Sequence, residues 1–487
     1  MIRISIKQYR RIRFGFLPSD KAMATTEVLP SSFRDPAGFL FKRGDILYRQ
    51  INQTYAADYE AAQKNGLFEA LFKARLLIPH DEADIEPADA DSCYKIIQPK
   101  LVSFISHPYE WSFSQLKDAA LATMTIQRLA MQHGMCLKDA SAYNIQFYEG
   151  RAMLIDTLSF IQYEEGKPWQ GYKQYCQHFL APLALMSATD VRLSQLLRVY
   201  IDGIPLDIAS KLLPSRSYLS PFLLSHIHAH AKAQIQYGKT SDKPAGQEAK
   251  PISRKAMDAM LQAIHAGTRK LNWKRPETEW GDYYSATNYV DQALQHKEEL
   301  VRLYLSEIEI DGSQVHDLGA NNGHFSRLAC DLGYDAMAWD IDPVAVDSNY
   351  QQNKKDKLPN LLPLVLDLTN PSGAIGWASR ERESFAQRTK NSIILSLALV
   401  HHLAISNNVP LPLIADFFQE LAHHLIIEFI PKSDSQVKRL LSNRTDIFSE
   451  YDQQGFEKAF SEKFDILKTE EISSSERTLY LMRRIAT

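Results

Sequence analysis

The run VHDLGANNGHFSRLACDLGYDAMAWDID at residues 315–342 constrains the fold of this chain more than any other segment. A short apolar strand that ends at Val315 is followed by a turn containing Gly319 and Gly323, and then by a helix with apolar residues at helical spacing. A second strand ends at Asp340. A glycine turn at the first strand–helix junction, with an acid about 20 residues further on, predicts a βαβ unit that binds a nucleotide-like ligand.

The spacing of the residues in the turn narrows the class of ligand that it can bind. The turn reads Asp317-x-Gly319-x-Asn321-x-Gly323, whereas dinucleotide enzymes use G-x-G-x-x-G to hold a pyrophosphate on helix amides. An acid at the head of the turn repels phosphate and attracts an amine. The segment therefore resembles motif I, D/E-x-G-x-G-x-G, of the class I S-adenosylmethionine-dependent methyltransferases. Asn321 replaces the middle glycine, and asparagine tolerates the left-handed backbone there.

This resemblance implies S-adenosylmethionine as the cofactor and assigns parts of it to particular residues. Asp317 and Gly319 would face the methionine part, Asp340 the two ribose hydroxyls, and Asp367 the adenine amine. The full set of cofactor-binding residues that it implies is Asp317, Gly319, Ala320, Asn321, Gly323, Asp340, Ile341, Asp367 and Ser396.

The rest of the C-terminal half keeps an alternation of strands and helices. A helix is expected to start at Asp342-Pro343. Apolar strands are expected to end at Asp367, near Ser396 and near Glu428, and two β-patterned runs at 464–472 and 477–485 predict a terminal hairpin. The pattern resembles the Rossmann-like, seven-stranded α/β sheet of the class I methyltransferases.

Residues after the fourth expected strand are candidates for catalysis. The segment from Ser396 to Leu403 lacks the Asn/Asp-Pro-Pro-aromatic turn typical of enzymes that methylate base amines. His401 and His402 are candidate general bases for an oxygen or carbon acceptor, and the alternative is that one packs in the core while the other caps a helix. Glu428 is a candidate acceptor-site residue, or a buried structural partner. Its combination with His424 and the two adjacent histidines lacks the spacing of a known metal site, so no metal is expected.

Length and composition limit the classes of protein to which this chain can belong. A chain of 487 residues predicts two or three domains. A net charge of −3 gives no electrostatic signal for nucleic acid. Four scattered cysteines without a C-x-x-C pair suit a reducing compartment, which favours the cytoplasm. No apolar run is long enough to span a membrane.

Composition shifts also indicate domain boundaries. Residues 1–30 are expected as an extension of uncertain start, at Met1 or Met23, and the polar stretch 237–253 as a linker. The expected domains are 31–236 and 309–487. Between them, 254–308 is expected as a helical cap or lead-in, whose aromatics either line an acceptor pocket or pack on the sheet: Trp273, Trp280, Tyr283, Tyr284 and Tyr289.

The N-terminal half carries a second motif. A helix over 114–135 is followed by Asp139, Asn144, a strand–turn–strand pair and Asp156. This order resembles the catalytic segment of the protein-kinase-like fold, an α+β fold. The resemblance implies Asp139 as the base, Asn144 and Asp156 as ligands of Mg²⁺, and ATP as a cofactor.

Several positions depart from the kinase pattern. Leu137 replaces the histidine of the loop, Thr157 follows the metal-ligand position where phenylalanine is usual, and Arg49 replaces the phosphate-anchoring lysine. These departures favour a degenerate binding domain over an active kinase. A helical domain with a coincidental D-x₄-N spacing is the other alternative.

Three alternating histidines, His226, His228 and His230, stand near the end of this half. On a strand they would share one face, as metal ligands can. The flanking residues instead favour a solvated helix, on which only the first and third align.

The chain resembles a nodulation-associated group of methyltransferase-like bacterial proteins in four features: the kinase-like N-terminal segment, the W-x-x-Y stretch at Trp280–Tyr283, the D-L-G-A-N-x-G motif, and E-F-I-P-K-x-D at 428–434. They predict a two-domain S-adenosylmethionine-dependent methyltransferase that is O- or C-directed on a small-molecule or glycan-like acceptor. The alternative is a kinase-like phosphotransferase or nucleotide-binding module with a non-catalytic methyltransferase fold. A third hypothesis is an interaction protein in which both folds are inactive.

Overall fold

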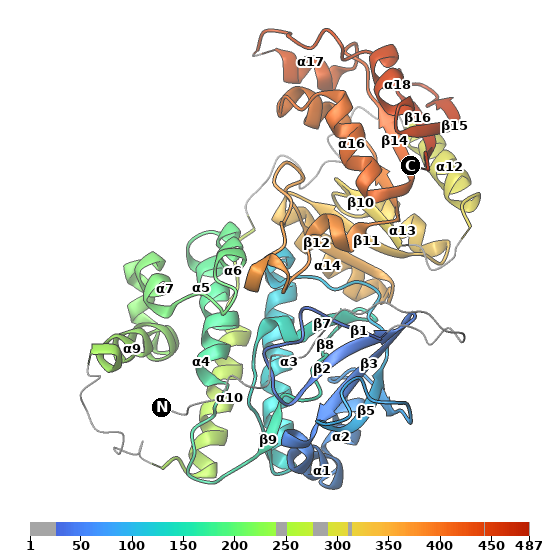
Figure 1. The fold of residues 1–487 in the computed structure, drawn as a ribbon. Coiled ribbons are helices and arrows are strands. Elements are labelled where there is room, and N and C mark those ends of the chain that lie inside the picture. Colours follow the sequence, from blue (N-terminus) through green and yellow to red (C-terminus); the bar gives the residue numbers. More distant parts are fainter. Residues whose placement is uncertain (1–25, 240–250, 276–290, 310–313, 443, 487) are drawn as a thin grey trace.

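The computed structural model describes residues 26–239, 251–275, 291–309, 314–442 and 444–486. Two parts lie one above the other in Figure 1, with the N-terminal part below in blue to green and the C-terminal sheet above in yellow to red. The predicted aromatics Trp280, Tyr283, Tyr284 and Tyr289 lie outside the described residues, as do residues 1–25 of the expected N-terminal extension.

The C-terminal part is built on a seven-stranded sheet in the order β12-β11-β10-β13-β14-β16-β15. Its first five strands are parallel, and β16 runs antiparallel between β14 and β15. The predicted α/β sheet with a terminal antiparallel hairpin is therefore confirmed. The strands are β10 Gln314–Leu318, β11 Asp335–Asp340, β12 Leu361–Val365, β13 Ser392–Ser396, β14 Ala422–Phe429, β15 Phe464–Glu471 and β16 Thr478–Arg484.

The first strand is longer than the sequence pattern predicted. It continues past Val315 to Leu318 because two polar side chains, His316 and Asp317, are buried within it. The Nε1–H of Trp339 on the neighbouring strand donates to His316 Nδ1 at 3.0 Å. A buried polar pair between strands therefore replaces the polar turn that was expected there.

Helices cover both faces of the sheet, as the apolar character of its strands requires. On one face, α12 and α13 pack against side chains such as Val315 and Ile393. On the other face, α16 and α18 pack against side chains such as Ile394 and Tyr480. The helices of this part are α12 Asp291–Ser306, α13 His324–Asp331, α14 Pro343–Asp356, α15 Phe385–Thr389, α16 Leu411–Leu421, α17 Ser435–Leu441 and α18 Gln453–Ser461.

The N-terminal part begins with a five-stranded antiparallel sheet in the order β1-β2-β3-β5-β4. Two short helices lie between β3 and β4, and the long helix α3 follows the sheet. The predicted hairpin is present as β7 and β8, and β6 pairs with β9. The elements are β1 Thr26–Val28, β2 Gly38–Arg43, β3 Ile46–Asn52, α1 Ala56–Lys64, α2 Leu67–Lys73, β4 His80–Glu82, β5 Cys93–Pro99, α3 Phe113–Gln132, β6 Met135–Leu137, β7 Ile145–Tyr148, β8 Arg151–Leu154 and β9 Phe160–Gln162.

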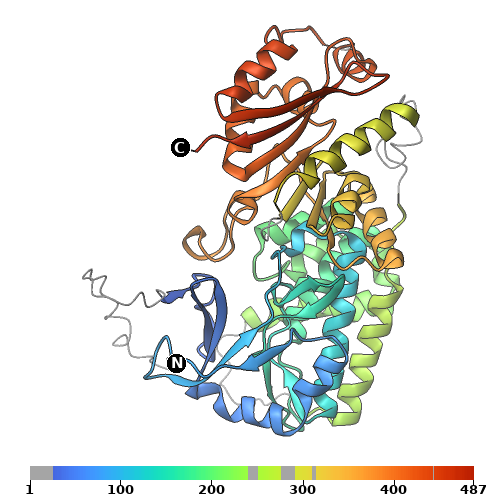
Figure 2. The same ribbon diagram turned by 90° about the vertical axis from the view of Figure 1, so that its right-hand side faces the viewer.

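Helices complete the N-terminal part, and the last of them comes from beyond the expected linker. Helix α10, Arg254–Lys270, runs alongside α3 (Figures 1 and 2). Tyr175 Oη and Thr268 Oγ1 lie 3.1 Å apart, and Arg254 donates to the carbonyl of Met131 at 2.7 Å. The other helices are α4 Tyr172–Tyr175, α5 Ala181–Ala188, α6 Leu196–Val199, α7 Leu206–Leu212, α8 Pro221–Leu223 and α9 His230–Lys239.

The two parts share a buried interface. Phe104 packs edge-on against Trp339, and Phe147 packs edge-on against Tyr350. Tyr350 also donates its hydroxyl to Asp118 at 2.8 Å. Aromatic packing of this kind fixes the relative position of the two parts.

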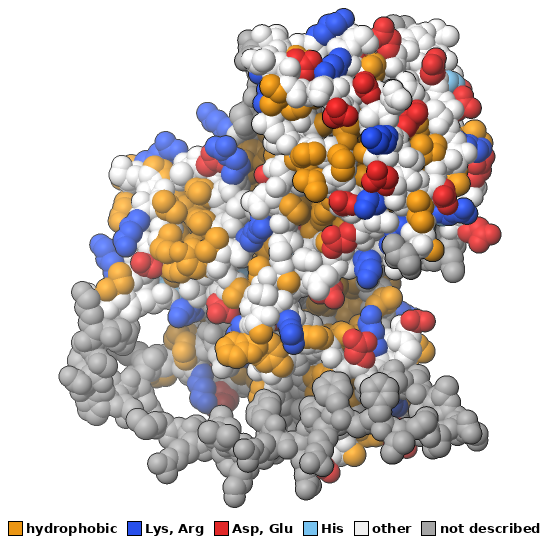
Figure 3. All heavy atoms as spheres, turned by 45° about the horizontal axis from the view of Figure 1, so that its top comes forward, with side chains coloured by type: hydrophobic (Ala, Val, Ile, Leu, Met, Phe, Trp, Pro, Cys, Tyr) orange, Lys and Arg blue, Asp and Glu red, His pale blue; other side chains and the backbone are white. Residues whose placement is uncertain are grey.

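Two further observations bear on partners. The face shown in Figure 3 intersperses basic and acidic side chains without an extended area of either sign. Within the described ranges, no helix has the length and apolar character needed to cross a bilayer.

Candidate functional site

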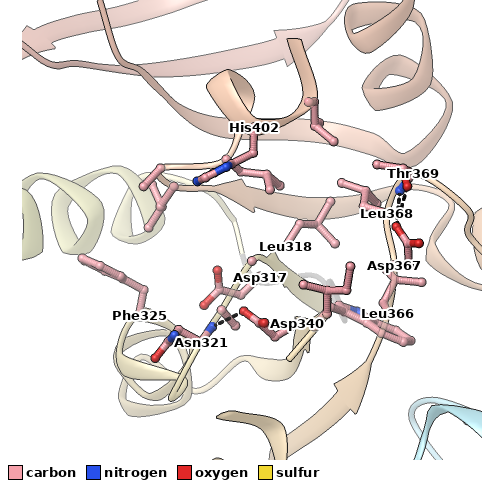
Figure 4. A pocket seen from close by; sticks show the side chains of 18 of the residues that line it. Asp317, Leu318, Asn321, Phe325, Asp340, Leu366, Asp367, Leu368, Thr369 and His402 are labelled. Carbon is pink, nitrogen blue, oxygen red and sulfur yellow. Dashed lines mark hydrogen bonds between the residues drawn. The ribbon is translucent and has the colours of Figure 1, made fainter. Parts of the chain in front are cut away.

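The main candidate site lies where the order of the parallel strands reverses, between β10 and β13. Open α/β sheets bind ligands at this point, beside the carboxyl ends of the strands. A cavity of about 250 Å³ opens there, and Figure 4 shows its lining from close by. The lining residues are Leu294, Lys297, Asp317, Leu318, Gly319, Ala320, Asn321, Phe325, Trp339, Asp340, Ile341, Leu366, Asp367, Leu368, Thr369, Leu397, Ala398, Leu399, His402, Leu403 and Asn407.

The glycine turn adopts the backbone that its sequence predicted. Gly319, Asn321 and Gly323 all have positive φ, at 80°, 49° and 78°. A β-carbon on Gly323 would approach the side chain of Asn349 to 2.3 Å, so only glycine fits there. The turn therefore keeps its backbone close to the cavity with no side chain at its tightest point.

Asp340 fixes this turn from the end of β11. One carboxylate oxygen accepts from the Asn321 amide and the other from the Asp342 amide, each at 2.8 Å. Burial raises the pKa of Asp340 to about 6. Because each carboxylate oxygen has a second lone pair, Asp340 can still accept two hydroxyl groups from a ligand in the cavity.

Asp317 is the second buried acid of the site. It accepts from Ser326 Oγ at 2.6 Å, and burial raises its pKa to about 6. The ammonium of Lys297 lies within electrostatic reach of this carboxylate and lines the same cavity. An acid and a base that line one cavity can bind the ammonium and the carboxylate of an amino acid.

Lys297 belongs to a buried network that the sequence did not reveal. Its Nζ donates to Glu428 Oε2 at 2.6 Å, and Arg477 lies 3.4 Å from the other oxygen of Glu428. The same Glu428 accepts from the amide of Ala398, a residue with a positive φ of 52° that lines the cavity. Burial lowers the pKa of Lys297, and this effect outweighs the opposite effect of the Glu428 and Asp317 carboxylates.

A sequence signal for Lys297 did exist. It stands four residues after Ala293 and three before Leu300, within the apolar stripe of α12. A charged residue inside such a stripe has to find a buried partner.

The adjacent histidines take different positions. His402 lines the cavity and lies across it from Asp317 and Asp340 (Figure 4). His401 is buried outside the lining, and burial lowers its pKa well below the usual value. Glu428 is also fully buried outside the lining. Only His402 of these three faces the cavity.

Most of the predicted cofactor residues meet at the cavity. The exceptions are Gly323, which starts α13, and Ser396, whose side chain is buried at the end of β13. Asp367 lines the cavity and accepts from the hydroxyl of Thr369 at 2.6 Å. Acids at three strand ends, with apolar walls between them, fit a ligand that carries cationic and hydroxyl groups, as S-adenosylmethionine does.

The affinity of a cationic cofactor is expected to depend on pH. With both Asp317 and Asp340 near pKa 6, protonation below about pH 6 removes the charge that attracts it. Affinity should therefore be constant above about pH 7 and fall below pH 6, by up to about tenfold per unit for each carboxyl. Titrations between about pH 5 and 8 measure this. A flat profile would contradict it.

The folding stability of the unliganded protein should depend on pH with the opposite sign, falling as pH rises. A carboxyl whose pKa rises on folding binds its proton more tightly in the folded state. Its contribution to stability is therefore lost as pH rises from about 4 to about 6. Melting temperatures with and without ligand separate the two effects.

The three side chains of the kinase-like motif also lie close together in the N-terminal part: Asp139, Asn144 and Asp156. Asp156 accepts from Arg49 and from the hydroxyl of Ser159, and Asn144 donates to the same hydroxyl at 3.4 Å. The pKa of Asp139 is raised by burial and by Asp156. The Arg49 guanidinium instead lowers the pKa of Asp156. Arg49 therefore neutralises one of the two expected Mg²⁺ ligands.

The alternating histidines lie on helical segments, as their flanking residues predicted. His226 contacts the hydroxyl of Tyr172 at 2.8 Å. His228 is buried between the hydroxyls of Ser210 and Ser217 rather than solvated. Within the part of the chain that the structure describes, no group of three or more His, Cys, Asp or Glu side chains could hold a metal ion.

One curated relative matches nearly the whole chain. Over 460 residues the chain is 35% identical to the nodulation protein NoeA of Rhizobium meliloti (strain 1021). The match covers 93% of this chain and 95% of NoeA. No family model matches the chain.

Solved structures match a smaller share. Magnesium protoporphyrin IX methyltransferase (ChlM) from Synechocystis PCC 6803 is 15% identical over 42% of this chain and 94% of that chain, with a TM-score of 0.30. N-methyltransferase NodS from Bradyrhizobium japonicum WM9 is 13% identical over 42% and 93%, with a TM-score of 0.31. The bifunctional kinase-methyltransferase WbdD is 11% identical over 40% of each chain, with a TM-score of 0.28.

Proposed function

The chain belongs to the family of the nodulation protein NoeA, and we propose that it is an S-adenosylmethionine-dependent methyltransferase, because its own glycine turn lines a cavity at the strand reversal. The observation that carries this proposal is the cavity at the strand reversal. It presents Asp340 beside the glycine turn and Asp317 beside Lys297.

Each polar residue of the cavity has a role in this proposal. Asp340 accepts the ribose hydroxyls and Asp367 the adenine amine. Asp317 attracts the α-ammonium, and Lys297 donates to the α-carboxylate. The turn at Gly319 lets the backbone approach the methionine part. When bound, the cofactor supplies an electrophilic methyl group on its sulfonium.

The proposed acceptor is an oxygen or carbon of a small molecule or glycan-like compound. His402 faces the cavity from the side opposite the acids, where it can take the proton that the acceptor loses. The Asn/Asp-Pro-Pro-aromatic turn of base-amine methyltransferases is missing after β13. The remaining task of the protein is to align acceptor and methyl group for in-line displacement.

Calorimetric titration of the full chain with S-adenosylmethionine tests the cofactor. Micromolar binding with a stoichiometry of one is expected. Absence of binding would overturn the proposal. Isotope-labelled methyl groups then identify the acceptor class, because label should enter a small-molecule extract and not RNA or protein.

A second candidate function is supported by the convergence of Asp139, Asn144 and Asp156 in the N-terminal part. These groups could hold ATP with Mg²⁺ in a nucleotide-binding module. The ion pair between Arg49 and Asp156 opposes phosphoryl transfer, because it competes with the metal. Heat from ATP·Mg²⁺ in a parallel titration, with none from S-adenosylmethionine, would favour this function instead.

A further inference from the structure

An arginine of the C-terminal part lies against the N-terminal part without a hydrogen-bonding partner. Arg382 follows β12 in the chain, and its guanidinium lies 4.5 Å from the centre of the Tyr143 ring. Among the described residues, none forms a hydrogen bond or ion pair with this guanidinium, and its Nε is buried. Burial lowers the pKa of Arg382, which reflects the cost of holding its charge there.

The surrounding segment holds Arg382 in this position. Arg198 donates to the carbonyls of Asn370 and Pro371 at 3.2 and 3.0 Å. Arg34 pairs with Glu381 at 2.5 and 2.9 Å, and Glu381 also accepts from the amide of Trp377. The acid next to Arg382 is therefore already engaged. Contacts of its neighbours, rather than a partner of its own, place Arg382.

The segment is also fixed on the far side of Arg382. His107 Nε2 lies 3.1 Å from the carbonyl of Glu383, and Arg388 forms a buried ion pair with Glu110. These contacts leave Arg382 little freedom to turn towards solvent.

Several buried polar atoms near Arg382 also lack hydrogen-bonding partners among the described residues. They include Tyr143 Oη and His178 Nδ1. The rings of Tyr143 and His178 pack edge to face, with centres 6.3 Å apart. Burial and the charge of Arg382 lower the pKa of His178 to about 3, so this ring is neutral and can offer an N–H. The acids that attract Arg382 electrostatically are Glu381, which is engaged by Arg34, and Asp139.

We propose that Arg382, Tyr143 and His178 bind the phosphoryl group of a small molecule, at a site that the two parts of the chain complete together. A partly buried cation without a hydrogen-bonded anion is costly, and a guanidinium fork matches phosphate oxygens. Donors from three separate segments suit the several equivalent oxygens of a phosphoryl group better than the two of a carboxylate.

Inorganic phosphate is the first probe, added to the full chain at constant ionic strength with chloride as the reference salt. Phosphate should raise the melting temperature of the wild type and of Arg380→Gln, an exposed arginine two residues away. Arg382→Gln should weaken phosphate binding roughly tenfold or more. Equal stabilisation of wild type and Arg382→Gln, or none of the wild type, would overturn the proposal.

Two further measurements keep the test decisive. Tyr143→Phe removes only a hydroxyl and should weaken phosphate binding about threefold to tenfold, even if Arg382→Gln fails to fold. Phosphate binding that is unchanged in Tyr143→Phe would overturn the proposed site. Acetate should stabilise the wild type less than phosphate does, and equal stabilisation would contradict the phosphoryl assignment. Glucose 6-phosphate that binds more tightly than inorganic phosphate would point to an ester.

Discussion

Replacing Asp340 with alanine is expected to weaken the binding of S-adenosylhomocysteine, the product of methyl transfer, roughly 10- to 150-fold. The reason is that the two ribose hydroxyls lose a charged acceptor worth about 1.5–3 kcal/mol. The amides of Asn321 and Asp342 lose their acceptor as well, so the glycine turn loosens. Calorimetric titration of the full chain measures the effect.

Asp331→Ala is the matched control for this prediction. Asp331 is an exposed acid at the end of α13 and does not belong to the cavity lining. Its removal should leave the dissociation constant within about twofold of the wild type. A folded Asp340→Ala protein that binds the product as tightly as the wild type would disprove the role of Asp340.

The second large effect is expected at Lys297. Lys297→Met should weaken the binding of S-adenosylhomocysteine about 10-fold or more, because the α-carboxylate loses a charged donor. Binding of 5′-methylthioadenosine, which lacks the amino-acid part, should stay nearly unchanged. The ratio of the two dissociation constants is the readout, since a general loss of packing weakens both ligands alike.

A double variant guards against misfolding. Lys297→Met alone leaves Glu428 buried with one cationic partner fewer, which can cost about 3–5 kcal/mol of stability. Lys297→Met combined with Glu428→Gln removes both members of the pair and should keep the same ratio. If both ligands weaken equally in the double variant, Lys297 has only a structural role. If the wild type binds neither ligand, S-adenosylmethionine is not the cofactor of this protein.

Local spacing allowed much of the C-terminal part to be predicted. The turn from Asp317 to Gly323 and the acid at Asp340 form a continuous pattern, and the structure brings Asp317 and Asp340 to one cavity. The terminal hairpin was predictable for the same reason, because its two strands are adjacent in sequence.

Contacts between distant segments could not be predicted in this way. The pair of Lys297 and Glu428 joins residues 131 positions apart, and no local pattern links the two. The contact of Arg382 with Tyr143 depends on how the two parts of the chain pack. His316 and Asp317 look like the start of a polar turn, yet they lie inside a strand because neighbouring elements supply their partners.

Helix α10 sets a limit on how this chain can be divided. Its apolar face, with Met257, Leu261 and Ile264, is buried in the core of the N-terminal part, although it follows the polar stretch that resembles a domain boundary. A fragment that begins at residue 251 would expose this stripe and invite aggregation. A chimaera that exchanges the C-terminal part and keeps the N-terminal part stable therefore has to be joined after Lys270.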